Sequence, residues 1–482
     1  MYGITFDPVS RLSQYRQLVE QLRGKITDGT LPGGTKLAST RELAERLGVA
    51  RGIVLEAVDQ LKMEGSLDPV HGSGTFVRSG LVWDSGTQPG GIPTAGVRGA
   101  TDGRGDARES DARENDANRR EPLSFAPGMP DMELFPRRAW LSCYHDAVEY
   151  ASLEDLGYNR PSGHWSLRVA IANHLHEMKG IRVGPERIVV TAGSSQAFAL
   201  LAGIFERARV VMEDPQAPFM RRIFDGLGCD IAYVPVDDEG IRHDLIPNGN
   251  ADLIYVTPTH QFPVGGTLSA ERRVALLGKA RDIGAWVIED DFDSEFRYDR
   301  NPVTPLQVMA PERVVYVGTF SKTVSPALRI GFMVVPPGVQ ARVKTLKRRW
   351  DLWNEGLQQK AMALFIERGH LARHLARAHR AYRRKNAFLR DLAAARLSPA
   401  WRVTGATTGM HLVIRRSSTD GKPADVAPVV DALAKRGLEA ESVSDYCHVH
   451  PGFTDSLLVA FGNRTAAELE RLVDEIAAYE KK

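Results

Sequence analysis

The sequence predicts a multidomain chain in which an N-terminal α+β winged helix-turn-helix precedes an α/β domain with a smaller α+β part at its C-terminal end. Residues 1–79 have the pattern of short helices followed by a β-hairpin. From Pro122 onward, apolar runs such as IVVTAG, DLIYVTP and VVYVGTF alternate with amphipathic stretches. That alternation predicts a mostly parallel sheet covered by helices. A length of 482 residues also favours more than one domain.

The overall composition is typical of a soluble globular protein, with 43% hydrophobic and 25% charged residues. Because the formal net charge is only +2, any contact with nucleic acid must come from locally placed basic side chains. The three cysteines form no CxxC pair, which argues against a disulfide framework and favours the reducing cytoplasm. No apolar run is long enough to span a bilayer, and the first residues lack the regions of a secretory signal, so we expect no membrane contact.

Residues 80–121 are predicted to form a flexible linker between the two parts. The run GDARESDARENDANRRE is nearly balanced in charge and has almost no apolar side chains, so it cannot bury a core. A coil of about 40 residues reaches on the order of 35 Å. The second part then covers residues 122–482, with a large region at about 150–345 and a small region at about 346–482.

Two short helices in the first part predict a helix-turn-helix. The run Ser39-Thr40-Arg41-Glu42 matches a capping box, in which a serine caps a helix and a glutamate reaches back to it. The helix should end at Gly48, and a second should begin near Ala50. That second helix would enter the major groove of DNA, with Arg51 at its exposed start, while Arg41 suits a phosphate contact.

The following run, SLDPVHGSGTFV, predicts a two-stranded wing whose glycine-rich tip can approach the minor groove closely. The alternative is a helical module for protein contacts, because residues 1–80 hold ten Lys or Arg against nine Asp or Glu. On the DNA-binding interpretation, we expect contacts from the following set: Ser39, Thr40, Arg41, Arg51, His71, Gly72 and Gly74.

The run LPGGTKLASTRELAERLGVARGIVLEAVDQLKMEGSLDPVHGSGTFV resembles the GntR-type winged helix almost from end to end. One departure is Ala38, where the family usually has proline, and this should loosen the start of the helix without removing its cap. The resemblance implies a transcription regulator that binds a double-stranded DNA operator.

Three motifs in the second part together predict a pyridoxal-phosphate site. Lys322 follows an apolar strand, where desolvation would lower its pKa and free the amine for Schiff-base chemistry. Arg329 is suited to a phosphate dianion, and Gly193-Ser194-Ser195 lie where a helix N-terminus can hold one. The strand AWVIEDD ends in Asp290 and Asp291, and a carboxylate beside a pyridine nitrogen keeps it protonated. Taken singly, such a lysine is more often a surface residue at a strand end, and such carboxylates more often form a solvated cap. The order of the motifs along the chain favours the cofactor site.

In this order the motifs resemble the fold-type I aminotransferases. With the winged helix in front, all of the chain except the linker resembles the MocR subfamily of GntR regulators, including GYNRPSGHWSLRVAIANHL, THQFPVGGTLS and EDDFDSEFRYD. The resemblance implies pyridoxal 5′-phosphate as cofactor, with Lys322 forming the Schiff base and Asp290 facing the pyridine nitrogen. It also implies further contacts: Arg329, Thr319, Ser194 and Ser195 at the phosphate, His260 near the ring, and Tyr158 at the phosphate of the partner subunit.

The sequence departs from the family pattern at the ring. Phe292 stands where the family usually has a tyrosine that hydrogen-bonds the 3′-oxygen, and Phe262 stands where aminotransferases have asparagine. Ala217 replaces the aromatic residue that covers the ring, although Phe219 lies close enough in sequence to fill the gap. Either the remaining contacts still hold the ring, or the pocket is reshaped for another ligand. The ring oxygen is then left to other partners: water, His260 or Gln261.

We therefore expect a regulator that senses an amine, an amino-acid-type effector or pyridoxal phosphate itself, with at most residual transaminase activity through Lys322. The alternatives are a working aminotransferase with an incidental winged helix, and a protein that has lost the cofactor. Fold-type I sites are assembled between two subunits, so we expect a homodimer, in the head-to-tail arrangement common in the family, that reads two half-sites. The effector, the operator and the sign of regulation stay open.

Two weaker signals remain. The basic run ERGHLARHLARAHRAYRRKNAFLR predicts a solvated helix, with an accessory contact to DNA phosphates as an alternative. His370 and His374 are four residues apart but lack a third ligand, so we expect no metal site. The candidates for binding an effector carboxylate are Arg221, Arg222 and Arg464.

Overall fold

The computed structural model describes residues 2–7, 10, 12–70, 73–78, 123–158, 160–299, 303–418 and 421–480. The predicted wing-tip residues His71 and Gly72 and the predicted linker lie outside the described residues. Within the described ranges, no helix is long and apolar enough to cross a membrane.

The N-terminal unit has the predicted helices and hairpin. Helices α1 (Gln14–Thr27), α2 (Thr40–Leu47) and α3 (Arg51–Met63) precede the antiparallel strands β1 (Leu67–Val70) and β2 (Gly74–Val77). The hydroxyl of Ser39 accepts the N–H of Glu42 at 3.2 Å, and Gly48 ends α2 in the left-handed conformation. The carboxylate of Glu42 pairs with Arg46 at 2.8 Å rather than reaching back to Ser39, so one half of the expected capping box forms.

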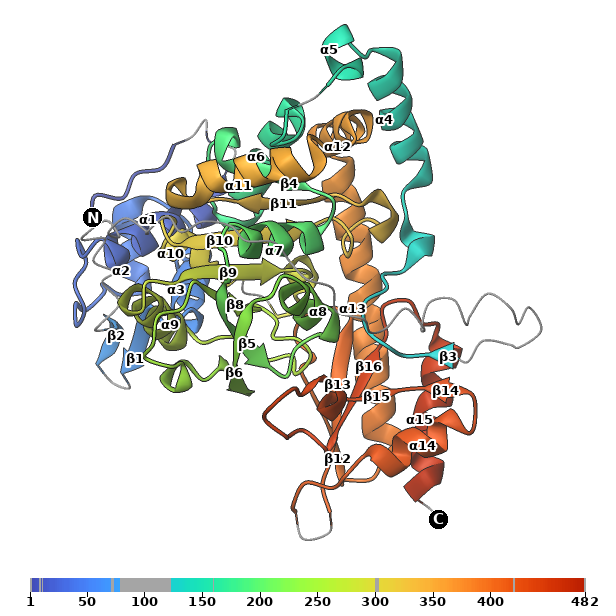
Figure 1. Ribbon diagram of the computed structural model, residues 1–482. Helices are drawn as coiled ribbons and strands as arrows, with labels where there is room; N and C mark the ends of the chain where they lie inside the picture. Colours follow the sequence, from blue (N-terminus) through green and yellow to red (C-terminus); the bar gives the residue numbers. More distant parts are fainter. Residues whose placement is uncertain are drawn as a thin grey trace.

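An eight-stranded sheet forms the centre of the molecule (Figure 1). Its order is β4-β11-β10-β9-β8-β5-β6-β7. Strand β11 runs antiparallel to both neighbours and β7 is antiparallel to β6, whereas the others pair in parallel. The bounds are β4 (Ile188–Thr191), β5 (Arg209–Asp214), β6 (Asp230–Asp237), β7 (Gly240–Ile241), β8 (Leu253–Val256), β9 (Trp286–Asp291), β10 (Val314–Thr319) and β11 (Gly331–Val334). The inner strands read as continuous apolar runs because both faces of the sheet are covered.

Helices cover the sheet on both faces. Phe198, Met220 and Val339 bring three helices, α7 (Ser194–Gly203), α8 (Pro218–Gly226) and α11 (Pro337–Asp351), onto one face. Leu276 and Leu277 bring α9 (Ala270–Asp282) onto the other. The remaining helices of this part are α4 (Arg137–Glu149), α5 (Leu153–Leu156), α6 (Trp165–Lys179), α10 (Leu306–Met309) and α12 (Gly356–Glu367). Single 3-10 turns occur at Met132–Leu134, Pro185–Arg187, His243–Leu245, Ser294–Phe296 and Pro326–Leu328.

The long helix α13 (His370–Arg396) leads from the large part into a smaller α+β part. That part has an antiparallel sheet in the order β12-β13-β16-β15. A short parallel pairing of β3 (Leu123–Ser124) with β14 (Leu438–Glu439) fixes the first residues after the linker to it. The other elements are β12 (Trp401–Thr404), β13 (His411–Arg416), β15 (Glu441–Ser442), β16 (Ser456–Ala460), α14 (Ala427–Ala434), α15 (Ala466–Glu480) and a 3-10 turn at Val443–Tyr446.

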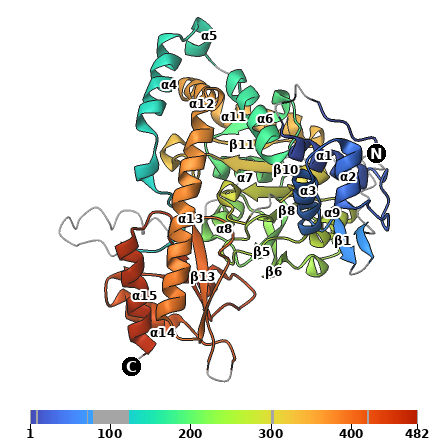
Figure 2. The ribbon, with the colours of Figure 1, turned by 180° about the vertical axis from the view of Figure 1, so that it is seen from behind.

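The winged helix lies against the large part (Figure 2). Glu20 of α1 pairs there with Arg182 of the large part at 2.6 Å. Helices α4 and α5 form an arm that projects from the body and carries exposed apolar side chains, including Leu153 at 89% exposure (Figure 1). Soluble monomers rarely leave such a surface uncovered.

Candidate functional site

A cavity of about 550 Å³ lies beyond the carboxyl ends of the central strands, between the large and small parts. Ligand sites of open α/β sheets are found at this edge. The cavity brings together most of the predicted cofactor residues: Ser194, Ser195, Asp290, Phe292, Thr319, Lys322 and Arg329. His260 and Tyr158 do not line it.

Lys322 follows β10 and reaches across the cavity, where its amine contacts the carbonyl oxygen of Gly128. Burial lowers the pKa of Lys322, against the opposing charges of Asp293 and Asp290. A lysine with a lowered pKa holds more of its amine in the neutral, nucleophilic form.

An anion site is built at the N-terminus of α7. Gly193 caps the helix with a φ of 84°, and the Arg329 guanidinium donates to the carbonyl of Ala192 at 2.8 Å. A Cβ atom at Gly193 would lie 2.6 Å from that guanidinium and would displace it, and the φ of 84° itself favours glycine. Arg329 itself has a φ of 46°, in the left-handed region. The unpaired N–H groups of the first helical turn and the guanidinium thus face the same cavity, as phosphate binding requires.

Asp290 is the cavity-facing carboxylate at the end of β9. It accepts a hydrogen bond of 2.6 Å from the hydroxyl of Tyr255 on β8. Burial raises the pKa of Asp290 to about 7. Asp290 is only 8% exposed, and the charge of Lys322 offsets this burial only in part.

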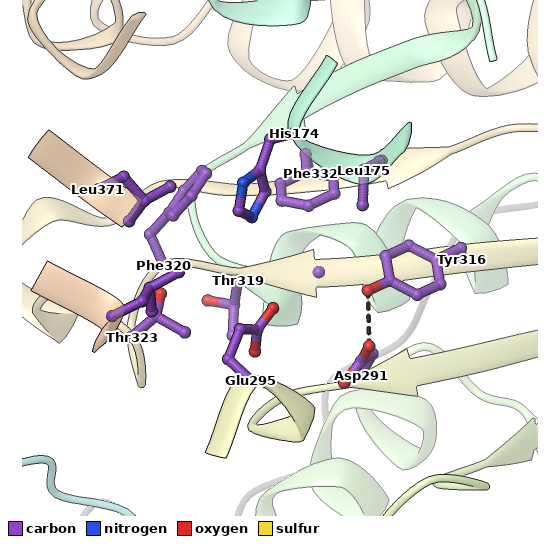
Figure 3. A pocket seen from close by; sticks show the side chains of 12 residues that line it. His174, Leu175, Asp291, Glu295, Tyr316, Thr319, Phe320, Thr323, Phe332 and Leu371 are labelled. Carbon is purple, nitrogen blue, oxygen red and sulfur yellow. Dashed lines mark hydrogen bonds between the residues drawn. The ribbon is translucent and has the colours of Figure 1, made fainter. Parts of the chain in front are cut away.

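Asp291, the next residue, faces the opposite side of the sheet (Figure 3). It accepts a hydrogen bond of 2.6 Å from Tyr316 and pairs with Lys179 at 3.1 Å. Burial alone would raise the pKa of Asp291, but Lys179, Ser294 and Tyr316 together hold it below its usual range. Lys179 also pairs with Glu295 at 3.3 Å. This cluster lines a crevice of about 240 Å³ shared with α1 of the winged helix.

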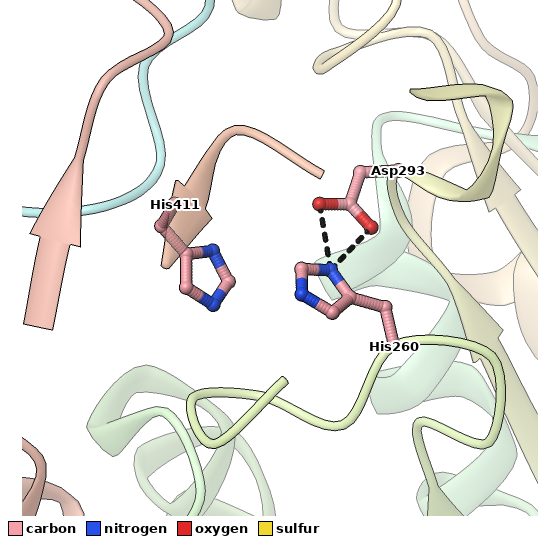
Figure 4. A group of neighbouring side chains, drawn as sticks. All are labelled: His260, Asp293 and His411. Carbon is pink, nitrogen blue, oxygen red and sulfur yellow. Dashed lines mark hydrogen bonds and ion pairs between the residues drawn. The ribbon is translucent and has the colours of Figure 1, made fainter. Parts of the chain in front are cut away.

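His260 lies behind the cavity wall. Its Nδ1 bonds Asp293 at 2.9 Å, and its ring centroid is 5.6 Å from that of Phe292 and 4.7 Å from that of His411 (Figure 4). The three polar side chains place possible metal ligands within 4.8 Å of one another. Because Nδ1 is already bonded to the carboxylate, the arrangement is that of an imidazole oriented by an aspartate. The sequence patterns did not point to Asp293, His411 or Tyr255, which come together only through the fold.

The three residues that depart from the family pattern around the cofactor ring line the cavity: Phe292, Phe262 and Ala217. Phe292 meets Phe262 edge to face, with ring centroids 6.1 Å apart, so two apolar rings occupy the positions where the family pattern has hydrogen-bonding side chains. Ala217 is buried at the start of α8, and Phe219 lines the cavity from the next turn.

Of the predicted effector-carboxylate candidates, Arg222 lines the cavity. Arg221 pairs instead with Asp225 at 2.9 Å, and Arg464 lies over the ring of Phe125 at 5.8 Å. The small part contributes Glu441, Asp445 and Tyr446 to the wall, which the sequence did not indicate. Tyr158 follows α5 and is 85% exposed, with its ring centroid 4.3 Å from that of Trp353. Its contact with a partner subunit stays a prediction.

The predicted DNA-reading residues lie on the winged helix as follows. Arg41 and Arg51 are exposed in the first turns of α2 and α3, Ser39 and Thr40 begin α2, and Gly74 begins β2 with a φ of 119°. His370 and His374 do not converge, because His374 is buried and bonds the carbonyl of Thr323 while His370 packs on Phe365.

Comparisons with known proteins cover both parts. Residues 14–77 match bacterial regulatory proteins of the gntR family, and residues 142–476 match aminotransferase class I and II. The chain is 32% identical to the HTH-type pyridoxine biosynthesis transcriptional regulator PdxR of Corynebacterium glutamicum over 98% of this chain and 97% of that protein. It is 33% identical to the probable rhizopine catabolism regulatory protein MocR of Rhizobium meliloti, over 86% of this chain and 83% of that one.

Among solved structures, a multiple substrate aminotransferase from Thermococcus profundus superposes with a TM-score of 0.69 at 23% identity, covering 77% of this chain and 94% of that one. An archaeal alanine:glyoxylate aminotransferase gives 0.68 at 26% identity, covering 75% and 91%. The predicted winged helix and fold-type I architecture are thereby confirmed.

Proposed function

Since the chain belongs to the MocR-type GntR transcription regulators, with an aminotransferase-like domain behind the DNA-binding winged helix, we propose that it binds pyridoxal 5′-phosphate in the cavity and uses this site to sense an effector. The effector is an amine or amino-acid-type ligand, or pyridoxal phosphate itself. It acts by changing the equilibrium between two arrangements of the winged helices, and its differential affinity for the two sets the size of the response.

The observation that carries the proposal is the uncompensated carboxylate of Asp290. Asp290 and Asp291 each accept a hydrogen bond from a tyrosine, yet of the two only Asp291 has a lysine within ion-pair distance, and only Asp290 has a raised pKa. A protonated pyridine nitrogen beside Asp290 would supply the missing positive charge.

The other residues fit the rest of the cofactor. Lys322 would hold it covalently, and Arg329 with the N-terminus of α7 would bind its phosphate in the cradle that Gly193 keeps open. When bound, the group supplies an electrophilic aldehyde carbon and an electron-withdrawing ring. Phe292 and Phe262 bring neither a hydroxyl nor an amide to the ring, which favours sensing over rapid turnover.

The alternative, an active aminotransferase with an appended winged helix, is favoured by the lowered pKa of Lys322. We rank it second because the ring-side hydrogen bonds are missing. A homodimer, head-to-tail as the resemblance implies, is supported by the apolar arm of α4 and α5, and two winged helices would then bind two half-sites of an operator in the cytoplasm.

The first experiment is reductive trapping. The protein is incubated with pyridoxal phosphate, reduced with borohydride and digested, and the modified peptide is identified by mass spectrometry. We expect the pyridoxyl group on Lys322, and none after Lys322→Ala. Lys344→Ala is the matched control, because burial also lowers the pKa of Lys344, which lies outside the cavity. Adduct on another lysine, or no adduct, would overturn the cofactor site.

The second experiment separates regulator from enzyme. Fluorescence anisotropy measures binding to the DNA upstream of the protein's own gene, with and without pyridoxal phosphate and amino donors, while keto-acid formation is followed in parallel. We expect DNA binding that responds to ligand and turnover near background. Rapid transamination without DNA binding would reverse the order of the two proposals.

A further inference from the structure

The solvent face of α13 carries a row of arginines. Helix α13 buries Leu371, Leu375, Tyr382 and Leu389 against the body. The opposite face exposes a set of like charges, here called the arginine stripe: Arg373, Arg377, Arg380, Arg383, Arg384 and Arg390. Between its first and last members the stripe extends roughly 25 Å along the helix axis. Figure 2 shows this long helix spanning the large and small parts.

The stripe is largely unneutralised. Among the described residues, no carboxylate lies within ion-pair distance of Arg380, Arg383, Arg384 or Arg390. Arg373 and Arg377 donate to main-chain carbonyls of Arg368 and Leu134, which carry no net charge. One exposed acid, Asp391, follows the stripe on the helix.

The neighbouring helix α15 behaves differently. Its carboxylates pair with cations: Glu468 with Arg464, Asp474 with Arg396 and Glu475 with Arg436. The whole chain is close to neutral, at a formal net charge of +2. A row of unpaired arginines is therefore a local feature, and its mutual repulsion would be relieved by a polyanion.

We propose that the arginine stripe is a second contact surface for DNA, which binds the phosphate backbone without reading sequence. The proposal rests on the proposed DNA-binding function, because the winged helix brings a polyanion of matching charge to this protein. Duplex DNA carries one charge per about 3.4 Å of each strand, so a stripe of this length spans several phosphates. Guanidinium groups are suited to such contacts because they bind phosphate oxygens with two parallel donors.

The test uses salt dependence, which counts phosphate contacts. The full-length protein and the triple variant Arg380→Gln, Arg383→Gln, Arg384→Gln are titrated into a 40-base-pair duplex of random sequence between 50 and 200 mM salt. We expect the slope of log affinity against log salt to become shallower by up to about 2.7, and affinity at the lowest salt to fall at least about tenfold. The matched control, Arg207→Gln, Arg402→Gln, Lys435→Gln, removes the same charge from other exposed positions and should change affinity less than about twofold.

The outcomes separate this inference from the proposed function. If the wild type binds no DNA, the proposed function fails. If it binds its own upstream DNA, loses that binding on Arg51→Ala, and the triple variant keeps the wild-type salt slope, the stripe inference alone is overturned. A triple variant that traps pyridoxal phosphate normally but changes oligomeric state in size-exclusion chromatography would assign the stripe to a second copy of the chain, and would also overturn it.

Discussion

The cavity side and the winged-helix side of the central sheet meet at the end of β9, where two consecutive aspartates face in opposite directions. Asp290 and Asp291 are almost equally buried, at 8% and 7% exposure, and each accepts a 2.6 Å hydrogen bond from a tyrosine on the neighbouring strand. Their pKa values nevertheless shift in opposite directions, upward for Asp290 and downward for Asp291. The difference is Lys179, which pairs with Asp291 at 3.1 Å, whereas Lys322 acts on Asp290 without forming an ion pair and offsets its burial only in part. On the winged-helix side, Lys179 balances the charge of Asp291. On the cavity side, a bound ligand would have to supply the positive charge that stabilises ionised Asp290.

The largest effect on this difference is expected from removing Lys179, the cation that pairs with Asp291. Lys179→Met should lower the free energy of unfolding by about 3–5 kcal/mol, because it leaves two buried carboxylates, Asp291 and Glu295, without the cation that pairs with both. Urea denaturation at pH 7 measures the loss. Lys344→Met, on a partly buried lysine that contacts only a main-chain carbonyl, should cost much less. Equal losses in the two variants would mean that Lys179 is not what holds the charge of Asp291.

The cavity side predicts a pH dependence of stability in the cofactor-free protein. The pKa of Asp290 is raised to about 7, so between pH 4 and 7 the folded state holds a proton that the unfolded state has lost. The stability that this group contributes is present at low pH and is lost as pH rises through 7. Asn cannot ionise, so Asp290→Asn should gain on the wild type as pH rises from 5 to 8, by on the order of 3 kcal/mol.

Glu213 and Glu289 also have pKa values raised to about 7. Glu289 is present in both proteins and cancels in the comparison, whereas Asp290 contributes to the raised pKa of Glu213, so its removal adds to the gain of the variant at high pH. Saturating pyridoxal phosphate should reduce the gap, since its ring nitrogen would stabilise the charged carboxylate. A gap that does not depend on pH contradicts the raised pKa of Asp290.

The two tyrosines offer a sharper comparison. Tyr255→Phe and Tyr316→Phe remove equivalent donors, each from one aspartate, and each should cost about 1–3 kcal/mol. At pH 7 the loss should be larger for Tyr316→Phe, because Asp291 is fully charged while Asp290 is close to half protonated. Chemical denaturation of both variants at pH 5 and pH 8 tests this. The difference between them should shrink at pH 8, and a constant difference would speak against it.

The smallest effect is expected at Phe292, where the family usually has a tyrosine that hydrogen-bonds the 3′-oxygen of the cofactor ring. Phe292→Tyr places a hydroxyl in the cavity wall, and the stability of the protein should change by less than about 1 kcal/mol. In protein loaded with pyridoxal phosphate, the pH at which the absorbance band titrates should fall by about one unit, because a hydrogen bond to the ring oxygen favours its charged form. Phe219→Tyr, which adds a hydroxyl to another part of the cavity wall, serves as the control. An unchanged titration would place the ring oxygen away from Phe292.

The parts of the molecule that depend on local sequence could be predicted from it. The serine cap at Ser39, the glycine stop at Gly48 and the apolar strands gave the elements in order, and the resemblance supplied the fold-type I architecture. At the site, strand alternation places Asp290 and Asp291 on opposite faces, but it does not say which face holds the cavity. That depends on which helices cover the sheet.

Contacts between distant segments could not be predicted. His260 was expected near the ring and does not line the cavity, because His411 from the small part packs against it and Asp293 fixes its Nδ1. Its place relative to the ring stays a prediction. Lys179 and Tyr255 carry no motif, and their importance follows only from the buried charges beside them. The domain limits, the role of Tyr158 and the wing-tip contacts stay predictions.

The left-handed backbone conformation of Arg329 carries an energetic cost. An L-residue other than glycine at a φ of 46° costs roughly 1–2 kcal/mol in steric crowding, and the structure places that residue where its guanidinium lines the cavity beside Gly193. Arg329→Gly would relax the main chain and would remove the guanidinium that we propose binds phosphate. The molecule thus carries a standing conformational penalty that glycine would abolish, as we expect of a position that serves ligand affinity rather than stability.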